Sequence, residues 1–216
     1  HHYLVGTTTE LYTPAGKTSP SPEELDGTGK LGLPYTTTDK TSDPALSNYE
    51  LVTPAPTNAT GTFQSGDQTV TYYYRRKNAG NITVNHYEVG TTTQLYSPTP
   101  GGTPSAQNFN GNEKLGLNEN ITNKVADIAN YEYVSVDVSG ASSATTPSSI
   151  GATTVTNGST PQTVIYYYRR KNAGNVVVNY LEQGTNTVLD TQETLDGTNK
   201  LGSAFTTVQK NINDYD

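Results

Sequence analysis

The sequence predicts a mainly β, α+β protein, built from small modules arranged in tandem as an elongated array. The first observation is an internal repeat, because Tyr72–Asn81 recurs letter for letter as Tyr166–Asn175. The second is that only 31% of the 216 residues are hydrophobic, which is too few for one thick core. The third is the abundance of Thr, Val and Tyr, which favour strands. Self-similarity of this kind indicates one structural unit used several times.

Alignment of the copies predicts three repeats, at residues 1–79, 80–173 and 174–216. The second repeat carries a Ser/Thr-rich insert at 139–160, where we expect a longer loop. The first repeat lacks its strand start and the third stops before its tyrosine strand, so we expect a piece of a longer array. The alignment also depends on a Gly-x-x-Lys-Leu-Gly motif, which begins at Gly27, Gly111 and Gly197.

Each repeat is predicted to begin with a strand and a hairpin. Apolar and polar residues alternate over 82–88, as in a half-buried strand. Gly90-Thr91-Thr92 then turns the chain back into 93–96. The Pro- and Gly-rich stretch 97–104 can only be a loop.

A short helical segment is predicted in the middle of the first two repeats. In the second repeat, residues 123–130 place Val125 and Ile128 on the same side of one or two helical turns. In the first repeat, Asp43 is the expected N-cap and Pro44 the first helical residue.

Two further strands are predicted, at 131–138 and at 162–170, and the second of these is expected to close the sheet. Alternation along the equivalent strand of the first repeat places Tyr72 and Tyr74 on the core face and Tyr73 on the outer face.

The charge balance disfavours two classes of partner. A net charge of −7 with a pI of about 4.9 argues against nucleic acid and anionic membranes, and no stretch is long and apolar enough for membrane insertion. The Arg-Arg-Lys runs at 75–77 and 169–171 read as solubilising residues. They could also pair with a carboxylate of the next repeat, Glu88 or Glu182, at a gain of under about 1 kcal/mol.

The sequence offers little for catalysis. It has 3 His, no Cys and no Gly-x-Ser-x-Gly motif, so pairs of nucleophile and base are scarce. The aspartates beside turn residues are expected to form Asx-turns (Asp26, Asp67, Asp190, Asp196 and Asp214). No calcium-loop spacing is present. We therefore predict no catalytic, cofactor-binding or metal-binding residue and no enzyme activity.

The order of four motifs resembles the MucBP (mucin-binding protein) repeats of Gram-positive bacterial surface proteins. These motifs are Gly-x-x-Lys-Leu-Gly-Leu-Pro-Tyr-Thr-Thr (27–37), Asn-Tyr-Glu-Leu-Val (48–52), Ala-Thr-Gly-Thr-Phe (59–63) and Gly-Asp-Gln-Thr-Val-Thr-Tyr-Tyr-Tyr (66–74). The second repeat departs from the pattern, with Asn118-Glu119-Asn120 in place of Leu-Pro-Tyr. The resemblance implies β-grasp (ubiquitin-like) modules in an extracellular, cell-wall-anchored protein.

The resemblance also implies host mucin or other glycoprotein glycans as partners. Tyr73 and Tyr167 on the outer face, with Tyr12 and Tyr96 near the hairpin tips, would offer flat platforms for sugar stacking. Two structural alternatives are open: Tyr73 makes a cross-strand pair on the outer face, or the tyrosines contact a neighbouring repeat.

Two functions follow from this reading. The first is an adhesin segment in which repeated weak sites gain avidity. The second is a passive stalk that projects a distal ligand-binding domain. In both, we expect a monomeric segment with no cofactor. We also expect hinges at 78–81 and 172–175 with modest interfaces between repeats.

Overall fold

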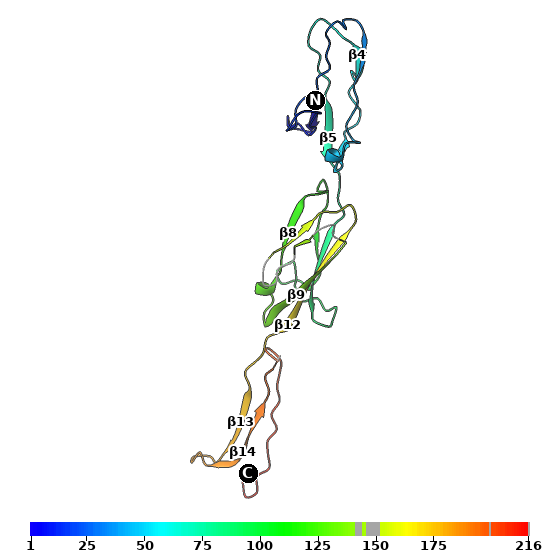
Figure 1. Cartoon of the computed structure of the whole chain (residues 1–216). Helices are drawn as coiled ribbons and strands as arrows, with labels where there is room; N and C mark the ends of the chain where they lie inside the picture. The colour runs from blue at the N-terminus through cyan, green and yellow to red at the C-terminus, as the bar shows by residue number, and fades with distance from the viewer. Residues whose placement is uncertain (141–143, 146–151, 199, 216) are drawn as a thin grey trace.

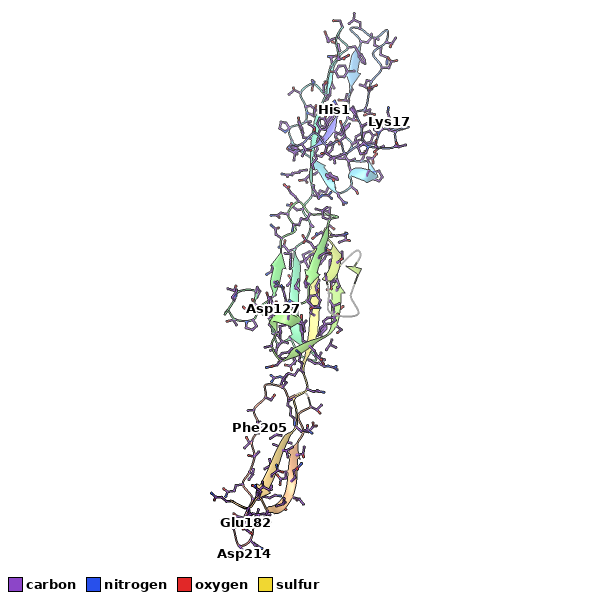
Figure 2. The ribbon with its side chains drawn as sticks, turned by 90° about the vertical axis from the view of Figure 1, so that its left-hand side faces the viewer. His1, Lys17, Asp127, Glu182, Phe205 and Asp214 are labelled. Carbon is purple, nitrogen blue, oxygen red and sulfur yellow. The ribbon has the colours of Figure 1, made fainter. Side chains whose placement is uncertain are left out.

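The computed structural model describes residues 1–140, 144–145, 152–198 and 200–215. Three groups of strands follow one another along one long axis, with the N-terminus in the first group and the C-terminus in the last (Figure 1). The view turned by 90° again shows His1, Asp127 and Asp214 in successive groups (Figure 2). The only helical elements among the described residues are two 3₁₀ turns. The prediction of a mainly β protein with small sheets in tandem is confirmed, whereas the β-grasp assignment stays a prediction.

The first group contains a three-stranded sheet in the order β1-β5-β3 and a second pair, β2-β4. Strand β5 is central: it pairs in parallel with β1 and antiparallel with β3. The elements are β1 (His2–Leu4), β2 (Pro34–Thr36), η1 (Pro44–Leu46), β3 (Tyr49–Leu51), β4 (Thr60–Thr62) and β5 (Tyr72–Arg76).

The second group has a four-stranded sheet in the order β7-β6-β12-β9 and a three-stranded sheet in the order β10-β11-β8. Strand β12, which the sequence predicted to close the sheet, lies inside the four-stranded sheet, parallel to β6 and antiparallel to β9. The elements are β6 (Ile82–Glu88), β7 (Gln107–Phe109), β8 (Asn118–Thr122), η2 (Val125–Asp127), β9 (Tyr131–Ser139), β10 (Ala144–Thr145), β11 (Ala152–Thr156) and β12 (Gln162–Arg170).

The third group contains a two-stranded antiparallel sheet of β13 (Val176–Leu181) and β14 (Val188–Leu195). The hairpins predicted at the start of the first two repeats are present in reduced form. Each is a single antiparallel bridge, Tyr3 with Glu10 and Tyr87 with Gln94. A strand needs more than one such bridge, so the returning segments are irregular.

Both predicted helical segments form short 3₁₀ turns. Asp43 caps η1 as expected, because its side chain accepts a hydrogen bond of 2.8 Å from the N–H of Ala45, and Pro44 opens the turn. The turn η2 has no side-chain cap.

The segment predicted as a loop insert in the second repeat contains a core strand. Strand β11 pairs antiparallel with β8, and Val155 is fully buried. The correction has a simple reason: burial alternates along 152–156, as in a strand with one face on a core, and the buried side chains are Thr153 and Val155. The rest of the expected insert, at 141–143 and 146–151, lies outside the described residues.

The core of the second group lies between its two sheets and is small. It consists of buried side chains from β6, β8, β11 and β12 together with Ile128. The first group has a still smaller cluster of Leu46, Tyr72 and Tyr74. The predicted alternation of β5 is confirmed, because Tyr72 and Tyr74 are buried and Tyr73 is 45% exposed.

Tyrosine hydroxyls bind the two sheets of the second group together. The Tyr166 hydroxyl donates to the carbonyl oxygen of Ile121 on β8 at 2.5 Å and contacts the hydroxyl of Thr153 on β11 at 2.9 Å. In the first group, the hydroxyl of Tyr72 contacts that of Thr37 at 2.9 Å. A buried phenol needs such partners, because an unpaired hydroxyl costs free energy.

A second tyrosine of the same strand is paired with a buried histidine. The backbone N–H of Lys124 donates to the Tyr168 hydroxyl at 3.0 Å, and that hydroxyl lies 2.8 Å from Nδ1 of His86. Nε2 of His86 lies 3.1 Å from the amide oxygen of Gln107, which can only accept. His86 is therefore neutral with its proton on Nε2, and Nδ1 accepts from Tyr168.

The first group repeats this arrangement. The N–H of Lys40 donates to the Tyr74 hydroxyl at 2.9 Å, which lies 2.9 Å from Nδ1 of His2. Burial lowers the pKa of both His2 and His86 to about 4, because the charged imidazolium would lose its hydration.

Replacing Tyr166 with Phe should lower the free energy of unfolding of the second group by about 1–3 kcal/mol, because the Ile121 carbonyl loses its buried donor. Tyr167→Phe is the matched control. The Tyr167 side chain faces outward on the same strand, so the free energy of unfolding should change by no more than about 0.5 kcal/mol. Urea denaturation of the two variants checks the difference, and equal losses would contradict the alternation of β12.

Acid should destabilise the protein between pH 6.5 and about 4. The pKa of His86 is about 4 in the folded protein and 6.5 ordinarily, so within this window the unfolded chain binds a proton that the folded protein does not. Stability is then lost as pH falls, by up to about 1.4 kcal/mol per pH unit for each buried histidine. Thermal unfolding at several pH values measures this slope.

A variant with both His2→Gln and His86→Gln should no longer lose stability through these histidines as the pH falls. The variant His1→Gln, at a half-buried position, should still show most of this loss. A slope between pH 6.5 and 4.5 that survives the double substitution would show that other groups cause it.

Candidate ligand-contact surface

The described residues form two equivalent shallow depressions, one in each of the first two groups, and each is lined by an exposed or half-exposed tyrosine and a Gly-Thr-Thr turn. The first is lined by Val5, Gly6, Thr7, Thr8 and Tyr73. The second is lined by Val89, Gly90, Thr91, Thr92, Thr93, Val134, Ser135 and Tyr167.

The sheet register positions the tyrosines. Parallel pairing of β1 with β5 places Tyr3 beside Tyr73, with ring centroids 6.4 Å apart. The cross-strand pair considered from the sequence is therefore present. In the second group, the same register places Tyr87 beside Tyr167. Loss of hydration and the nearby Glu10 carboxylate raise the pKa of Tyr3, so its ring carries no charge at neutral pH.

The threonine turn is fixed by its own hydrogen bonds. In the first group, the Thr7 hydroxyl donates to the Leu4 carbonyl at 2.9 Å and accepts from the N–H of Thr9 at 3.0 Å. In the second group, Thr91 makes the same pair of bonds at 3.0 and 3.1 Å. Gly6 has a φ of 74°, in the left-handed region that favours glycine. The turn is thus rigid before any ligand arrives.

The next hydroxyl of each turn faces solvent. Thr8 and Thr92 are exposed, and within the described part of the chain neither hydroxyl has a hydrogen-bond partner. Apolar side chains stand beside them, since Val5 is 45% exposed and Val89 48%. Each depression therefore combines an aromatic ring, an apolar side chain and a hydroxyl.

The first arginine of each basic run also lies on this face, but its partner differs from the expectation. Nε of Arg75 donates to Glu50 at 2.6 Å, and Nε of Arg169 donates to Glu132 at 2.6 Å. Both pairs join neighbouring strands of one sheet and do not reach Glu88 or Glu182 of the next repeat. Each pair offsets the charge of its arginine.

The structure does not bring the other two predicted tyrosines to these depressions. Tyr12 is half-buried against the first core cluster, with its edge towards His2 at 5.3 Å and the Lys40 ammonium 4.9 Å from its ring centroid. Tyr96 has the equivalent position against His86, with Lys124 5.5 Å from its centroid. Both rings lie on the core side of the sheet, away from Tyr73 and Tyr167.

Sequence reasoning found the two outer tyrosines and the Gly90-Thr91-Thr92 turn, but it did not place the turn beside the tyrosine as part of one surface. A signal was available, because Val-Gly-Thr-Thr at 5–8 recurs letter for letter at 89–92. The exposed Val134 of β9 was missed because it becomes a neighbour of Tyr167 only through sheet pairing.

The described residues contain no group of three His, Asp or Glu side chains placed to hold a metal ion. None of their helices is long and apolar enough to cross a membrane. The depressions offer stacking surface and hydroxyl hydrogen bonds, which suit weak contact with a neutral polyhydroxyl ligand.

Comparison with known proteins gives one family and two relatives. The MucBP domain matches residues 12–75, 81–169 and 175–216. Internalin J of Listeria monocytogenes serotype 4b (strain F2365) is 32% identical over 191 residues, which are 87% of this chain and 17% of that protein. Internalin J of Listeria monocytogenes serovar 1/2a (strain ATCC BAA-679 / EGD-e) is 43% identical over 84 residues, 38% of this chain and 9% of that protein.

The chain thus spans less than a fifth of the length of these relatives. The family match, in contrast, covers most of the chain in three separate segments. On this match, the chain belongs to the MucBP domain family.

Proposed function

We propose that this chain is a non-catalytic segment of an extracellular adhesin on a Gram-positive cell surface, and that it binds mucin or other glycoprotein glycans weakly through its repeated modules. The observation that carries the proposal is the recurrence of the same depression, a Val-Gly-Thr-Thr turn beside an outward tyrosine, in two modules. Membership of the MucBP family supports the choice of ligand.

The chemistry of each depression fits a sugar. The apolar face of a pyranose would stack on the ring of Tyr73 or Tyr167, because aromatic faces attract C–H groups. The free hydroxyl of Thr8 or Thr92 would exchange hydrogen bonds with sugar hydroxyls. An open, shallow site buries little of its ligand, so each site is weak.

Repetition compensates for this weakness. Two sites on one chain act on a multivalent mucin at a high effective concentration, and the apparent affinity exceeds that of either site alone. The proposal needs no cofactor and no nucleic acid, and it places the segment outside the cell on a wall-anchored protein.

A passive stalk is the second candidate. It is favoured by the linear arrangement of the three groups of strands (Figure 1). A stalk would show no affinity of its own for glycans, which separates the two functions.

Replacing both Tyr73 and Tyr167 with Ala should abolish retention of the chain on immobilised mucin, because both stacking platforms are lost. Either single substitution should weaken the apparent affinity by about 10²-fold, because avidity is lost with one site. Biolayer interferometry on a mucin-coated surface measures both effects. The matched control is Tyr215→Ala, which removes a ring that is 46% exposed but lies outside the depressions.

If the double variant is still retained on immobilised mucin, Tyr73 and Tyr167 are not the residues that bind it. Absence of binding by the unaltered chain, at high protein concentration and to a broad glycan array, would instead favour the stalk. Circular dichroism of each variant establishes that the sheets are intact.

A further inference from the structure

The links that follow the tyrosine strands, residues 78–81 and 172–175, were expected to act as hinges. The structure places each of them against the Gly-x-x-Lys-Leu-Gly motif of the next module. This motif, called the glycine loop below, begins at Gly27, Gly111 and Gly197 and ends at Gly32, Gly116 and Gly202.

At the first junction, the link is held by hydrogen bonds from both directions. The N–H of Ala79 donates to the Gly111 carbonyl at 2.8 Å. In return, the N–H of Glu113 donates to the side-chain oxygen of Asn78 at 2.8 Å, and the N–H of Gly111 donates to that of Asn81 at 3.1 Å. A hinge would need these backbone groups free to rotate.

The end of the tyrosine strand contacts the same loop. Nη1 of Arg76 donates to the Leu115 carbonyl at 2.8 Å, while Nη2 donates to the Tyr49 hydroxyl of its own module at 2.7 Å. The N–H of Leu115 donates to the Lys77 carbonyl at 3.1 Å. One guanidinium thus bridges the two modules, with its Cζ atom 4.7 Å from the Tyr49 ring centroid.

The second junction repeats this pattern. The N–H of Ala173 donates to the Gly197 carbonyl at 2.8 Å, and the N–H of Gly197 donates to the Asn175 side chain at 3.0 Å. The N–H of Leu201 donates to the Lys171 carbonyl at 3.2 Å. The arginine again contacts the next module, since Nη1 of Arg170 donates to the Ser203 hydroxyl at 3.1 Å, and its Cζ lies 5.5 Å from the Tyr131 ring centroid.

The first glycine of the loop lies so close to the link that no side chain fits. A Cβ at Gly111 would lie 2.4 Å from the Ala79 carbonyl oxygen, and a Cβ at Gly197 would lie 2.3 Å from that of Gly174. Both glycines are buried. The equivalent Gly27 is exposed, and a Cβ there would meet only the Phe63 ring at 3.2 Å. The need for glycine at the two junctions therefore comes from the link that packs against the loop.

The loop has its shape before it is contacted. No strand end from the described part of the chain lies on the loop of the first module, and Leu31 is 71% exposed. This loop nevertheless makes the same internal hydrogen bond as the other two. These bonds run from Lys30 N–H to Gly27 O at 2.9 Å, from Lys114 N–H to Gly111 O at 3.1 Å and from Lys200 N–H to Gly197 O at 3.1 Å. A preformed surface loses little conformational entropy on docking.

We propose that the glycine loop is a docking site for the basic end of a tyrosine strand from another copy of the module, and that this docking holds neighbouring modules in one orientation. The partner is identified by the two junctions of this chain, where equivalent groups of the link and the loop form the same three hydrogen bonds. The inference goes beyond glycan binding and does not depend on it.

The test is the distance between two spin labels placed on either side of the first junction. The sequence has no Cys, so Ser42→Cys and Thr122→Cys, at exposed positions, would be the only label sites. Double electron–electron resonance on the otherwise unaltered chain should give one narrow distance distribution. Gly111→Ala should broaden it at least about twofold, towards the free motion expected of modules without a large interface. Asn78→Ala, at an exposed position, should broaden it in the same direction without disturbing a core.

Gly27→Ala is the matched control, because it changes the same motif position where no link lies, and it should leave the distribution narrow. Circular dichroism and thermal unfolding verify that each labelled variant is folded. A broad distribution in the unaltered chain would overturn the proposal. So would a distribution that stays narrow in both Gly111→Ala and Asn78→Ala.

Discussion

The hydroxyl of Tyr168 lies between the N–H of Lys124 and Nδ1 of His86, in the interior of a module whose core contains few other large side chains. A sequence so poor in Leu, Ile and Phe must use tyrosine for bulk, and a buried phenol is stable only with its hydroxyl paired. The rest of the module depends on this constraint. The hydrogen bonds of the Tyr168 hydroxyl join β12 to the start of η2, and those of the Tyr166 hydroxyl join it to the second sheet. The core is therefore held by polar contacts as well as apolar ones.

The same strand serves both faces of the sheet. Because side chains alternate, tyrosines that are two residues apart close the core while the one between them is directed outward. Tyr167 is thereby held rigidly by a buried strand, and its neighbouring turn is fixed by the hydrogen bonds of Thr91. A weak site benefits from this rigidity, because little conformational entropy remains to be lost on binding.

The sequence predicted the features that depend on local pattern: the repeat, the strand 82–88, the cap at Asp43 and the faces of the tyrosines. It failed where distant segments meet. Residues 152–156 become a core strand only by pairing with β8, and Arg75 finds Glu50 only through the β3–β5 register. Likewise, Tyr12 turns towards the core because it packs on His2, a contact that hairpin position alone could not reveal.

Each junction joins two unlike surfaces, the basic end of a strand in one module and a glycine loop in the next. Such head-to-tail contacts have a direction and do not close on themselves, in contrast to the symmetric contacts of a dimer. Because each of the first two modules carries one surface of each kind at opposite ends of its long axis, units can be gained or lost during evolution without redesign of any joint. The reach of such a protein can therefore vary in whole-module steps while its local geometry stays constant.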